Sequence, residues 1–315
     1  MQAYLVRRFL MTIPVLLGIS VIVFLIMALI PGDPAMAILG SYATPENLAR
    51  LRADLGLDKP LAARYLTWIG NLFQGDLGRS YSLNRPVLDE VLDRFGATLI
   101  LATSALALCS IFGIIAGIVS AVRQYGWADK ILTLLVLVGI STPSFWLGLV
   151  LALFFAVKLG WFPASGMYAV YGGGGLVDLL RHLVLPAITL SVVATGVVAR
   201  LTRSSVLEVM RQDYVRTARA KGVDERRVIY RHVFRAAFVN IVPVIGIQAG
   251  FVLGGAVYIE TVFQWPGIGR MLVGAISTRD ILLVQGGVLL VAAFYVFVNL
   301  LVDAAQRGLD PRIKS

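Results

Sequence analysis

The chain has 315 residues, of which 58% are hydrophobic and 15% are charged. A soluble domain averages about 25% charged residues, so this much apolar surface cannot be hidden in one water-soluble core, and lipid must be part of the solvent. The formal net charge of +10 does not indicate nucleic-acid binding, because the basic residues cluster beside apolar stretches without interleaved aromatic residues. The single cysteine, Cys109, lies inside an apolar run, so no internal disulfide is expected.

About 20 apolar residues of helix are needed to cross a hydrocarbon core of about 30 Å. Six stretches meet this requirement and predict an all-α membrane protein with six transmembrane helices, near residues 9–30, 96–122, 131–157, 183–202, 237–259 and 281–302. A cleaved signal peptide is the alternative for the first stretch, because Arg7 and Arg8 precede it. Its apolar core is longer than a usual signal core, however, and Pro31 and Pro34 crowd the site where cleavage would fall.

The basic residues orient these spans. The segments expected on one side are 1–8, 123–130, 203–236 and 303–315. Together with Arg200 they hold 17 of the 28 Lys and Arg residues but only 7 of the 18 Asp and Glu residues, whereas the opposite side holds 11 of each kind. Because cytoplasmic loops carry an excess of Lys and Arg, we expect both termini in the cytoplasm.

The extracytoplasmic segment 31–95 has the marks of a small helical cap. Thr44-Pro45-Glu46 predicts a helix start, Gly56 can end that helix, and a second helix is expected from near Pro60. A third is expected over 86–94. This segment is either a passive lid or a docking surface for an extracytoplasmic partner.

The sequence suggests three regions along the chain. Residues 1–95 comprise the first span and this segment, 96–305 form a core of five helices, and 306–315 form a cytoplasmic tail.

The chain shows no means of powering transport by itself. No ionisable residue lies in the middle of a span, where ion-driven transporters usually place one, and no nucleotide-binding motif is found. The sequence also lacks a metal-ligand cluster and, in any span, a clustered acid, base or nucleophile, so neither a metal site nor an enzyme is expected. The chain is therefore either a passive pore or a subunit that receives energy from a partner.

The segment 203–236 offers a place where such a partner could act. It carries nine Lys and Arg residues and four acidic residues. Asp213 can cap a short helix, Gly222 can end it in the left-handed conformation, and Asp224 can cap a second short helix. Two short helices joined by a glycine would make a stiff projection able to transmit a push. The alternative is a basic loop that only fixes the orientation of the chain.

Pro143, Pro186 and Pro243 are predicted to interrupt the third, fourth and fifth spans. A proline within a span frees a backbone carbonyl, which a nearby Ser or Thr can satisfy. Such breaks serve as hinges or line a path, although they also occur in bundles without a special role. The candidate hinge or translocation-path residues are Ser141, Pro143, Ser144, Pro186, Thr195, Pro243 and Gln248.

A possible outer gate follows the fifth span. Pro266-Gly267 forces a turn, and the residues from Ile268 onward can form a short helix that re-enters the outer leaflet, with Trp265 at the interface. A plain connector is the alternative. The candidate gate residues are Glu260, Trp265, Pro266, Gly267 and Gly269.

Several motifs together resemble one family. Residues 214–222, Tyr-Val-Arg-Thr-Ala-Arg-Ala-Lys-Gly, followed by Val-Ile-Tyr-Arg-His-Val-Phe-Arg at 228–235, resemble the coupling loop of ABC importer permeases of the dipeptide/oligopeptide/nickel family. Further agreements, in the same order, are Leu29-Ile-Pro-Gly-Asp-Pro-Ala35, Gly75-Asp-Leu-Gly-Arg-Ser80, Thr142-Pro-Ser-Phe-Trp146, Leu185-Pro186, and Glu260 with Pro266-Gly-Ile-Gly269. The resemblance covers nearly the whole chain.

This resemblance implies the transmembrane domain of a type I ABC importer in the inner membrane. Its partners would be a second, related permease, two ATPase subunits that bind ATP and Mg, and an extracytoplasmic solute-binding protein. The chain itself would bind no cofactor. Peptides are the expected solute, with nickel, glutathione or a glycoside as alternatives, and a partner-independent channel as an alternative of another class. The residues that would contact the ATPase are Tyr214, Arg216, Ala218, Arg219, Ala220, Lys221 and Gly222.

Overall fold

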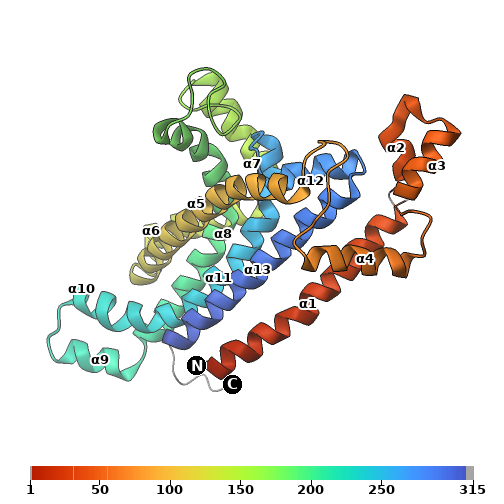
Figure 1. Ribbon diagram of the computed structural model, residues 1–315. Coiled ribbons are helices and arrows are strands. Elements are labelled where there is room, and N and C mark those ends of the chain that lie inside the picture. Colours follow the sequence, from red (N-terminus) through yellow and green to blue (C-terminus); the bar gives the residue numbers. More distant parts are fainter. Residues whose placement is uncertain (1, 31, 55, 310–315) are drawn as a thin grey trace. The chain divides into compact units, whose positions relative to one another are not determined.

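The computed structural model describes residues 2–30, 32–54 and 56–309. Within these ranges every regular element is a helix, apart from an isolated bridge between Arg79 and Pro86 (Figure 1). Five of the described helices are long and apolar enough to cross a membrane, and one sharply bent helix pair makes a sixth candidate span. The prediction of an all-α membrane protein is confirmed.

The chain divides into two compact units. One contains the residues up to Gly96 together with Gly267–Phe297, and the other contains Ala97–Pro266 and the described residues from Val298 onward. Long helices α5 and α13 each contribute to both units.

The first unit is built around two apolar helices and a set of short ones. Its elements are α1 (Gln2–Leu29), α2 (Pro34–Leu39), the 3-10 turn Gly40–Tyr42, α3 (Pro45–Asp54), α4 (Leu61–Phe73), the beginning of α5 (Val87–Val122), α12 (Ile268–Ser277) and α13 (Ile281–Leu309) as far as Phe297. Thr44 caps α3 by accepting the backbone N–H of Asn47 at 3.3 Å, and Gly56 follows the helix with a φ of 62°, as expected.

The predicted separate helix over 86–94 is wrong. Those residues are the first turns of α5, which continues without interruption to Val122. Gly96, near the expected break, is a weak helix former, but a single glycine costs only about 1 kcal/mol in a helix. The long apolar run that follows Gly96 therefore keeps the backbone helical.

Asp280 fastens the loop at 79–86 to the start of α13 in the first unit. It is 1% exposed, and its Oδ2 accepts hydrogen bonds from Ser80 Oγ at 2.5 Å, Ser82 N at 3.0 Å and Ser82 Oγ at 2.9 Å. Its Oδ1 accepts the N–H of Leu283 at 3.2 Å and so caps α13. One buried carboxylate therefore joins two segments that are 200 residues apart in sequence.

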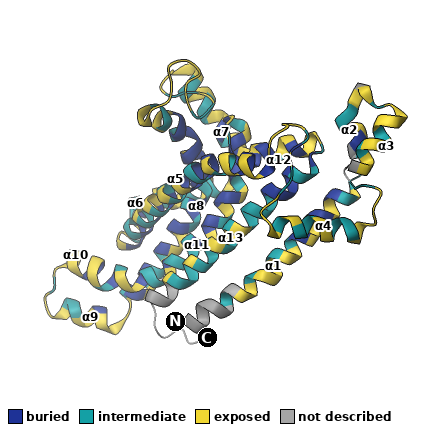
Figure 2. Cartoon of the chain, viewed as in Figure 1, coloured by how far each residue is buried: buried dark blue, intermediate teal, exposed yellow. Residues whose placement is uncertain are grey.

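The second unit is organised around α8. Its further elements are α6 (Trp127–Ser141), α7 (Ser144–Leu151), the π-helical segment Ala152–Lys158, α8 (Leu176–Met210), α9 (Asp213–Ala220), α10 (Glu225–Arg227), the π-helical segment Val228–Phe234 and α11 (Arg235–Val262). Figure 2 shows α8 largely buried, whereas α6 and α9 are mostly exposed. Small residues allow the close packing on α8: a Cβ on Gly196 would lie 2.7 Å from the Ile140 side chain, and one on Gly117 would lie 2.5 Å from Thr202.

The Asp280 contacts lead to a first prediction. Asp280→Ala removes an acceptor that serves four donors and should destabilise the first unit locally by about 2 kcal/mol. Hydrogen exchange followed by mass spectrometry should show faster exchange of the amides of Ser82 and Leu283. The exposed acid Asp58 provides the matched control Asp58→Ala, which should leave exchange at 80–86 as in the wild type. Unchanged protection in Asp280→Ala would show that the loop is held by other contacts.

Candidate functional site

The predicted coupling segment forms a compact projection, here called the elbow and comprising residues 211–224. Helix α8 ends at Met210, α9 occupies Asp213–Ala220, and the chain turns back through Gly222, whose φ is 75° (Figure 1). The left-handed Gly222 is confirmed, and so is the cap at Asp224, which accepts the N–H of Arg226 at 3.1 Å.

Two local predictions for this segment are wrong. Asp213 does not cap α9, because Gln212 occupies the N-cap position and Asp213 is the first helical residue, where its charge still favours the helix N-terminus. The second helix is not a separate short element either. It begins at Glu225 and continues through a π-helical stretch into α11, giving an unbroken helical segment that ends at Val262. Residues 228–234 are thus a membrane-proximal extension of a span.

A valine core fixes the elbow to these two long helices. Val215 of α9 is fully buried, at 0% exposure, between Val206 and Val209 of α8 and Val228 and Val233 of the α11 extension. Burying a valine side chain contributes about 1.5 kcal/mol or more. The elbow, the end of α8 and the beginning of α11 therefore form one packed piece.

The predicted contact residues of α9 have different surroundings. Tyr214, Arg216, Ala220, Lys221 and Gly222 are exposed. Ala218 packs against the valine core, and Arg219 is tied to Glu225, with its Nη2 donating to Oε1 at 2.7 Å. That hydrogen bond raises the pKa of Arg219 above its usual value. The exposed surface of the elbow therefore includes Tyr214 with the cationic groups of Arg216 and Lys221, and the exposed Asp213 lies 3.9 Å from Arg216.

A buried ion pair braces α8 just before the elbow. Asp129, near the start of α6, is 5% exposed and accepts two hydrogen bonds from Arg203 of α8, from Nε at 2.9 Å and from Nη2 at 2.8 Å. Ser120 Oγ also donates to Asp129, and so does the backbone N–H of Tyr125, at 2.9 Å. One carboxylate thus ties together α5, α6 and α8. The sequence analysis identified neither Asp129 nor its pairing with Arg203.

Between α6 and α7 the third span is broken at Pro143, as predicted. The two helical segments meet at 105°, and Thr142 is extended, with φ −85° and ψ 126°. Proline disfavours a helical conformation in the residue before it, which explains the extended Thr142. Thr142 Oγ1 donates to the Val138 carbonyl at 2.7 Å, which also accepts the Thr142 N–H at 3.0 Å, so this residue closes the end of α6 twice. Ser141 is exposed and Ser144 is half-buried.

At Pro186 and Pro243 the predicted interruption is wrong. Helices α8 and α11 continue through both prolines. Pro186 is buried, between the buried Leu185 and Ala187, so packing holds the backbone helical despite one lost hydrogen bond. Thr195 donates its Oγ1 to the Ser191 carbonyl at 2.8 Å, and Gln248 is 5% exposed inside α11.

The candidate gate is more buried than expected. Trp265 is 0% exposed, and its Nε1 donates to the Ala97 carbonyl at 2.8 Å, so its predicted place at the membrane interface is wrong. Glu260 is also 0% exposed and accepts from Thr98 Oγ1 at 2.6 Å. Both side chains therefore hold the end of α11 against Ala97 and Thr98, the first residues of α5 that belong to the second unit. An indole ring in a protein interior needs a partner for its N–H, and a neighbouring carbonyl provides it.

The turn at Pro266-Gly267 leads directly into α12. Pro266 is half-buried, and Gly267 is the N-cap of α12, with φ −92° and ψ 178°. Gly269 is buried in the first turn of that helix. The predicted short helix from Ile268 is confirmed.

Together, apolar spans, a break within one span and a basic helical elbow anchored to two spans define a multi-pass membrane transport subunit. Residues 1–102 match the family described as "Binding-prot-dependent transport system membrane comp, N-term", and residues 113–315 match "Binding-protein-dependent transport system inner membrane component". The chain belongs to this family of inner-membrane permeases. A permease subunit is not itself catalytic.

Curated relatives are similar over the full length. The dipeptide transport system permease protein DppB of Alkalihalophilus pseudofirmus is 42% identical over 332 residues, covering 100% of both chains. A putative peptide transport system permease protein of Brucella abortus is 44% identical over 314 residues, covering 100% of this chain and 99% of the relative. The di/tripeptide transport system permease protein DppB of Pseudomonas aeruginosa is 41% identical over 333 residues, with the same coverage.

The fold is also similar to solved importer subunits. An inward-facing structure of the MetNI methionine ABC transporter aligns with a TM-score of 0.56 at 15% identity, covering 71% of this chain and 97% of that chain. A second crystal form of the same transporter gives a TM-score of 0.56 at 19% identity, covering 70% and 96%. The shared architecture is that of an ABC importer transmembrane subunit.

The valine core leads to a second prediction. Val215→Ala removes two buried methyl groups and should cost about 2 kcal/mol of local stability, which raises the open population of the elbow by roughly 30-fold. Limited trypsin digestion should then cleave after Arg216 at least about tenfold faster. Thr217→Ala changes an exposed position of the same helix and serves as the control. Equal cleavage rates in all three proteins would show that the core does not hold α9.

The buried ion pair leads to a third prediction. Asp129→Asn leaves Arg203 without its charge partner, and because that side chain is 30% exposed, solvent reduces the cost to about 2 kcal/mol. The unfolding temperature of the detergent-purified chain should fall. The double variant with Arg203→Gln should lose less than the sum of the single losses, by at least about 1 kcal/mol. The exposed Glu208 on α8 gives the control Glu208→Gln, and strictly additive losses would rule out direct coupling.

Proposed function

We propose that this chain is the permease subunit of an ATP-driven importer and that α9 receives the push of a separate ATPase subunit. The observation that carries the proposal is the α9 elbow, which exposes Tyr214, Arg216 and Lys221 yet is locked to α8 and α11 through Val215. A projection that is rigid and also open to a partner can transmit force, whereas a loop that only fixed orientation would need no buried core.

The proposed assembly contains four further subunits. A second, related permease completes the path, two ATPase subunits bind ATP and Mg, and an extracytoplasmic solute-binding protein delivers the solute. This chain binds no cofactor of its own in this proposal. The excess of Lys and Arg on the side of the elbow supports a cytoplasmic location for α9 and for both termini.

Motion of the elbow would reach the path through the second unit. When the ATPase subunits close on ATP, α9 moves with α8 and α11, and the Asp129–Arg203 pair carries the movement to α6. The break at Pro143 then allows α7 to move differently from α6.

Ser141, Pro143 and Ser144 lie at that break and are the strongest candidates for lining the path. Thr195 in α8 and Gln248 in α11 are further candidates. The buried Glu260 and Trp265 would brace the outer end, so the gate function proposed for residues 260–269 would depend on Pro266 and Gly267.

Peptides are the proposed solute. Relatives at 41–44% identity over the full chain are named as permeases of peptide, dipeptide or di/tripeptide systems. Nickel, glutathione and glycosides are the competing solutes within the same architecture, because the binding protein sets much of the selectivity. Binding measurements on the cognate binding protein with dipeptides, tripeptides and nickel would separate them: selective dipeptide binding supports the proposal, and selective nickel binding contradicts the solute.

Gly222 gives the fourth prediction. A Cβ at this position would meet nothing within 4 Å in the chain, so a side chain there strains the backbone but does not clash inside the subunit. In the assembled transporter, Gly222→Leu should lower ATP-driven peptide uptake by at least about tenfold while membrane insertion persists, because the bulky group would obstruct the ATPase contact and the left-handed conformation costs about 1 kcal/mol. Uptake into vesicles and peptide-stimulated ATP hydrolysis are the measurements.

Gly222→Asn is the matched control, since asparagine adopts the left-handed conformation more readily and is smaller. It should retain most of the uptake. Normal uptake by Gly222→Leu would contradict the coupling role of the elbow. Solute flux through the purified chain reconstituted without partners would instead favour the partner-independent channel.

A further inference from the structure

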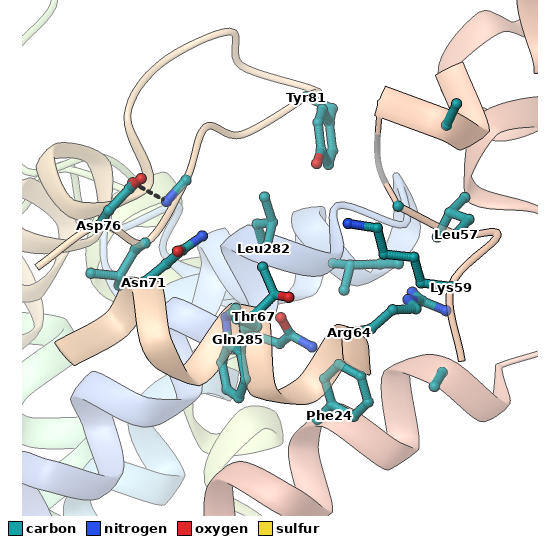
Figure 3. A pocket seen from close by; sticks show the side chains of 17 residues that line it. Phe24, Leu57, Lys59, Arg64, Thr67, Asn71, Asp76, Tyr81, Leu282 and Gln285 are labelled. Carbon is teal, nitrogen blue, oxygen red and sulfur yellow. Dashed lines mark hydrogen bonds between the residues drawn. The ribbon is translucent and has the colours of Figure 1, made fainter. Parts of the chain in front are cut away.

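A pocket of about 290 Å³ lies within the first unit, and none of its lining residues belongs to the elbow or to the broken span. Its walls come from the end of α1, the α3–α4 connection, one face of α4, the loop at 76–81 and the start of α13 (Figure 3). At this size the pocket lies at the lower end of the range for ligand sites and can hold a small polar group. The proposed transport function leaves it unused.

Gln285 of α13 is the strongest sign that the pocket is a built site. The residue is 2% exposed and lines the pocket, and its side-chain amide makes no hydrogen bond with any residue that the structure describes (Figure 3). Because Gln285 lines the pocket, this amide is left to pair with water or with a ligand inside the pocket. Placed near the start of a membrane span, such a group points to a polar ligand that satisfies it.

Two cations line the same pocket. Lys59 makes no ion pair with a described residue, and the Arg64 guanidinium lies 6.0 Å from the centre of the Phe24 ring without a described acidic partner. In Figure 3 the side chains of Lys59 and Tyr81 extend toward the same space. A single acid, Asp76, also lines the pocket, and its Oδ1 accepts the N–H of Gly78 at 2.8 Å. The site therefore suits a group with anionic oxygens that also carries a positive charge.

The position of the pocket along the spans indicates the source of such a group. Phe24 and Ala28 lie near the end of the apolar α1 and Gln285 lies near the start of the apolar α13, so the pocket sits where two candidate spans meet the polar layer. In the same stretch of α1, Val21 and Leu25 are exposed. Trp68 of α4 stacks on Phe24, with ring centres 6.0 Å apart. Tryptophan is enriched at the level of the lipid head groups, which agrees with this position of the pocket.

We propose that this pocket binds the head group of a zwitterionic aminophospholipid such as phosphatidylethanolamine. Lys59 and Arg64 hold the phosphate oxygens, Gln285 donates to an oxygen of the head group, and Asp76 accepts the ammonium group. The acyl chains stay outside the pocket and lie along the exposed apolar side chains of α1. Basic pockets between transmembrane helices bind the phosphate-bearing head groups of lipids such as cardiolipin, and Asp76 adds a partner for an ammonium group here. A bound lipid would fasten the segment 53–81 to the ends of α1 and α13.

The test is lipid retention by the full-length chain. The detergent-purified protein is titrated with phosphatidylethanolamine, and bound lipid is counted by native mass spectrometry. The wild type should retain one such lipid, and Lys59→Gln with Arg64→Gln should weaken binding by about tenfold or more. Arg50→Gln with Lys158→Gln is the matched control, because it removes the same charge at two exposed positions outside the pocket. Equal retention in both double variants would overturn the proposal.

Three further arms separate the possible ligands. Phosphatidylcholine, whose quaternary ammonium cannot donate a hydrogen bond, should bind more weakly than phosphatidylethanolamine, and Asp76→Asn should remove that difference. Inorganic phosphate at millimolar concentration should not displace the lipid, whereas efficient displacement would reduce the site to a simple anion site and contradict the proposal. Displacement by dialanine would identify a peptide site instead.

Gln285→Leu tests the amide separately. It should weaken lipid binding without lowering the unfolding temperature of the lipid-free protein, and unchanged binding would contradict the role assigned to Gln285.

Discussion

The packing of Val215 between α8 and the extension of α11 is the contact on which the rest of this account depends. This single buried side chain, with the four valines around it, converts a basic surface segment into a rigid part of two helices that cross the membrane. Without that core, α9 would be a loop of charged residues able to bind a partner but unable to pass on its motion. With it, we propose, the exposed face and the spans move as one body.

The rest of the second unit complements this rigid piece. The sequence places no ionisable residue in the middle of a span, which supports the proposal that the energy comes from a partner. The buried Asp129–Arg203 pair joins α6 to α8 close to the elbow. The third span of this unit is bent by 105° at Pro143. In the proposed mechanism, the ion pair at one end of α6 carries the movement of the elbow, and the break at the other end lets α7 respond to it.

The sequence anticipated what depends on neighbouring residues. The six apolar stretches, the Thr44 cap, the left-handed Gly222 and the Asp224 cap all follow from short-range rules. The break at Pro143 was foreseen as well, but the same rule failed at Pro186, because burial in α8 overrides the preference of an isolated proline. Pairings across long separations were out of reach, since Asp129 meets Arg203 at a separation of 74 residues and Asp280 meets Ser80 at 200. The burial of Trp265 was missed for the same reason: its partner, Ala97, is 168 residues away.

The central claim is that the elbow and α8 move as one body during the transport cycle. Spin labels on the exposed Arg216 of α9 and the exposed Arg200 of α8 report their separation in the assembled transporter, with and without trapped ATP. The account predicts an unchanged separation between these two labels, while the distance from Arg216 to the elbow of the partner permease changes. A change of more than about 5 Å, one helical turn, between Arg216 and Arg200 would contradict it.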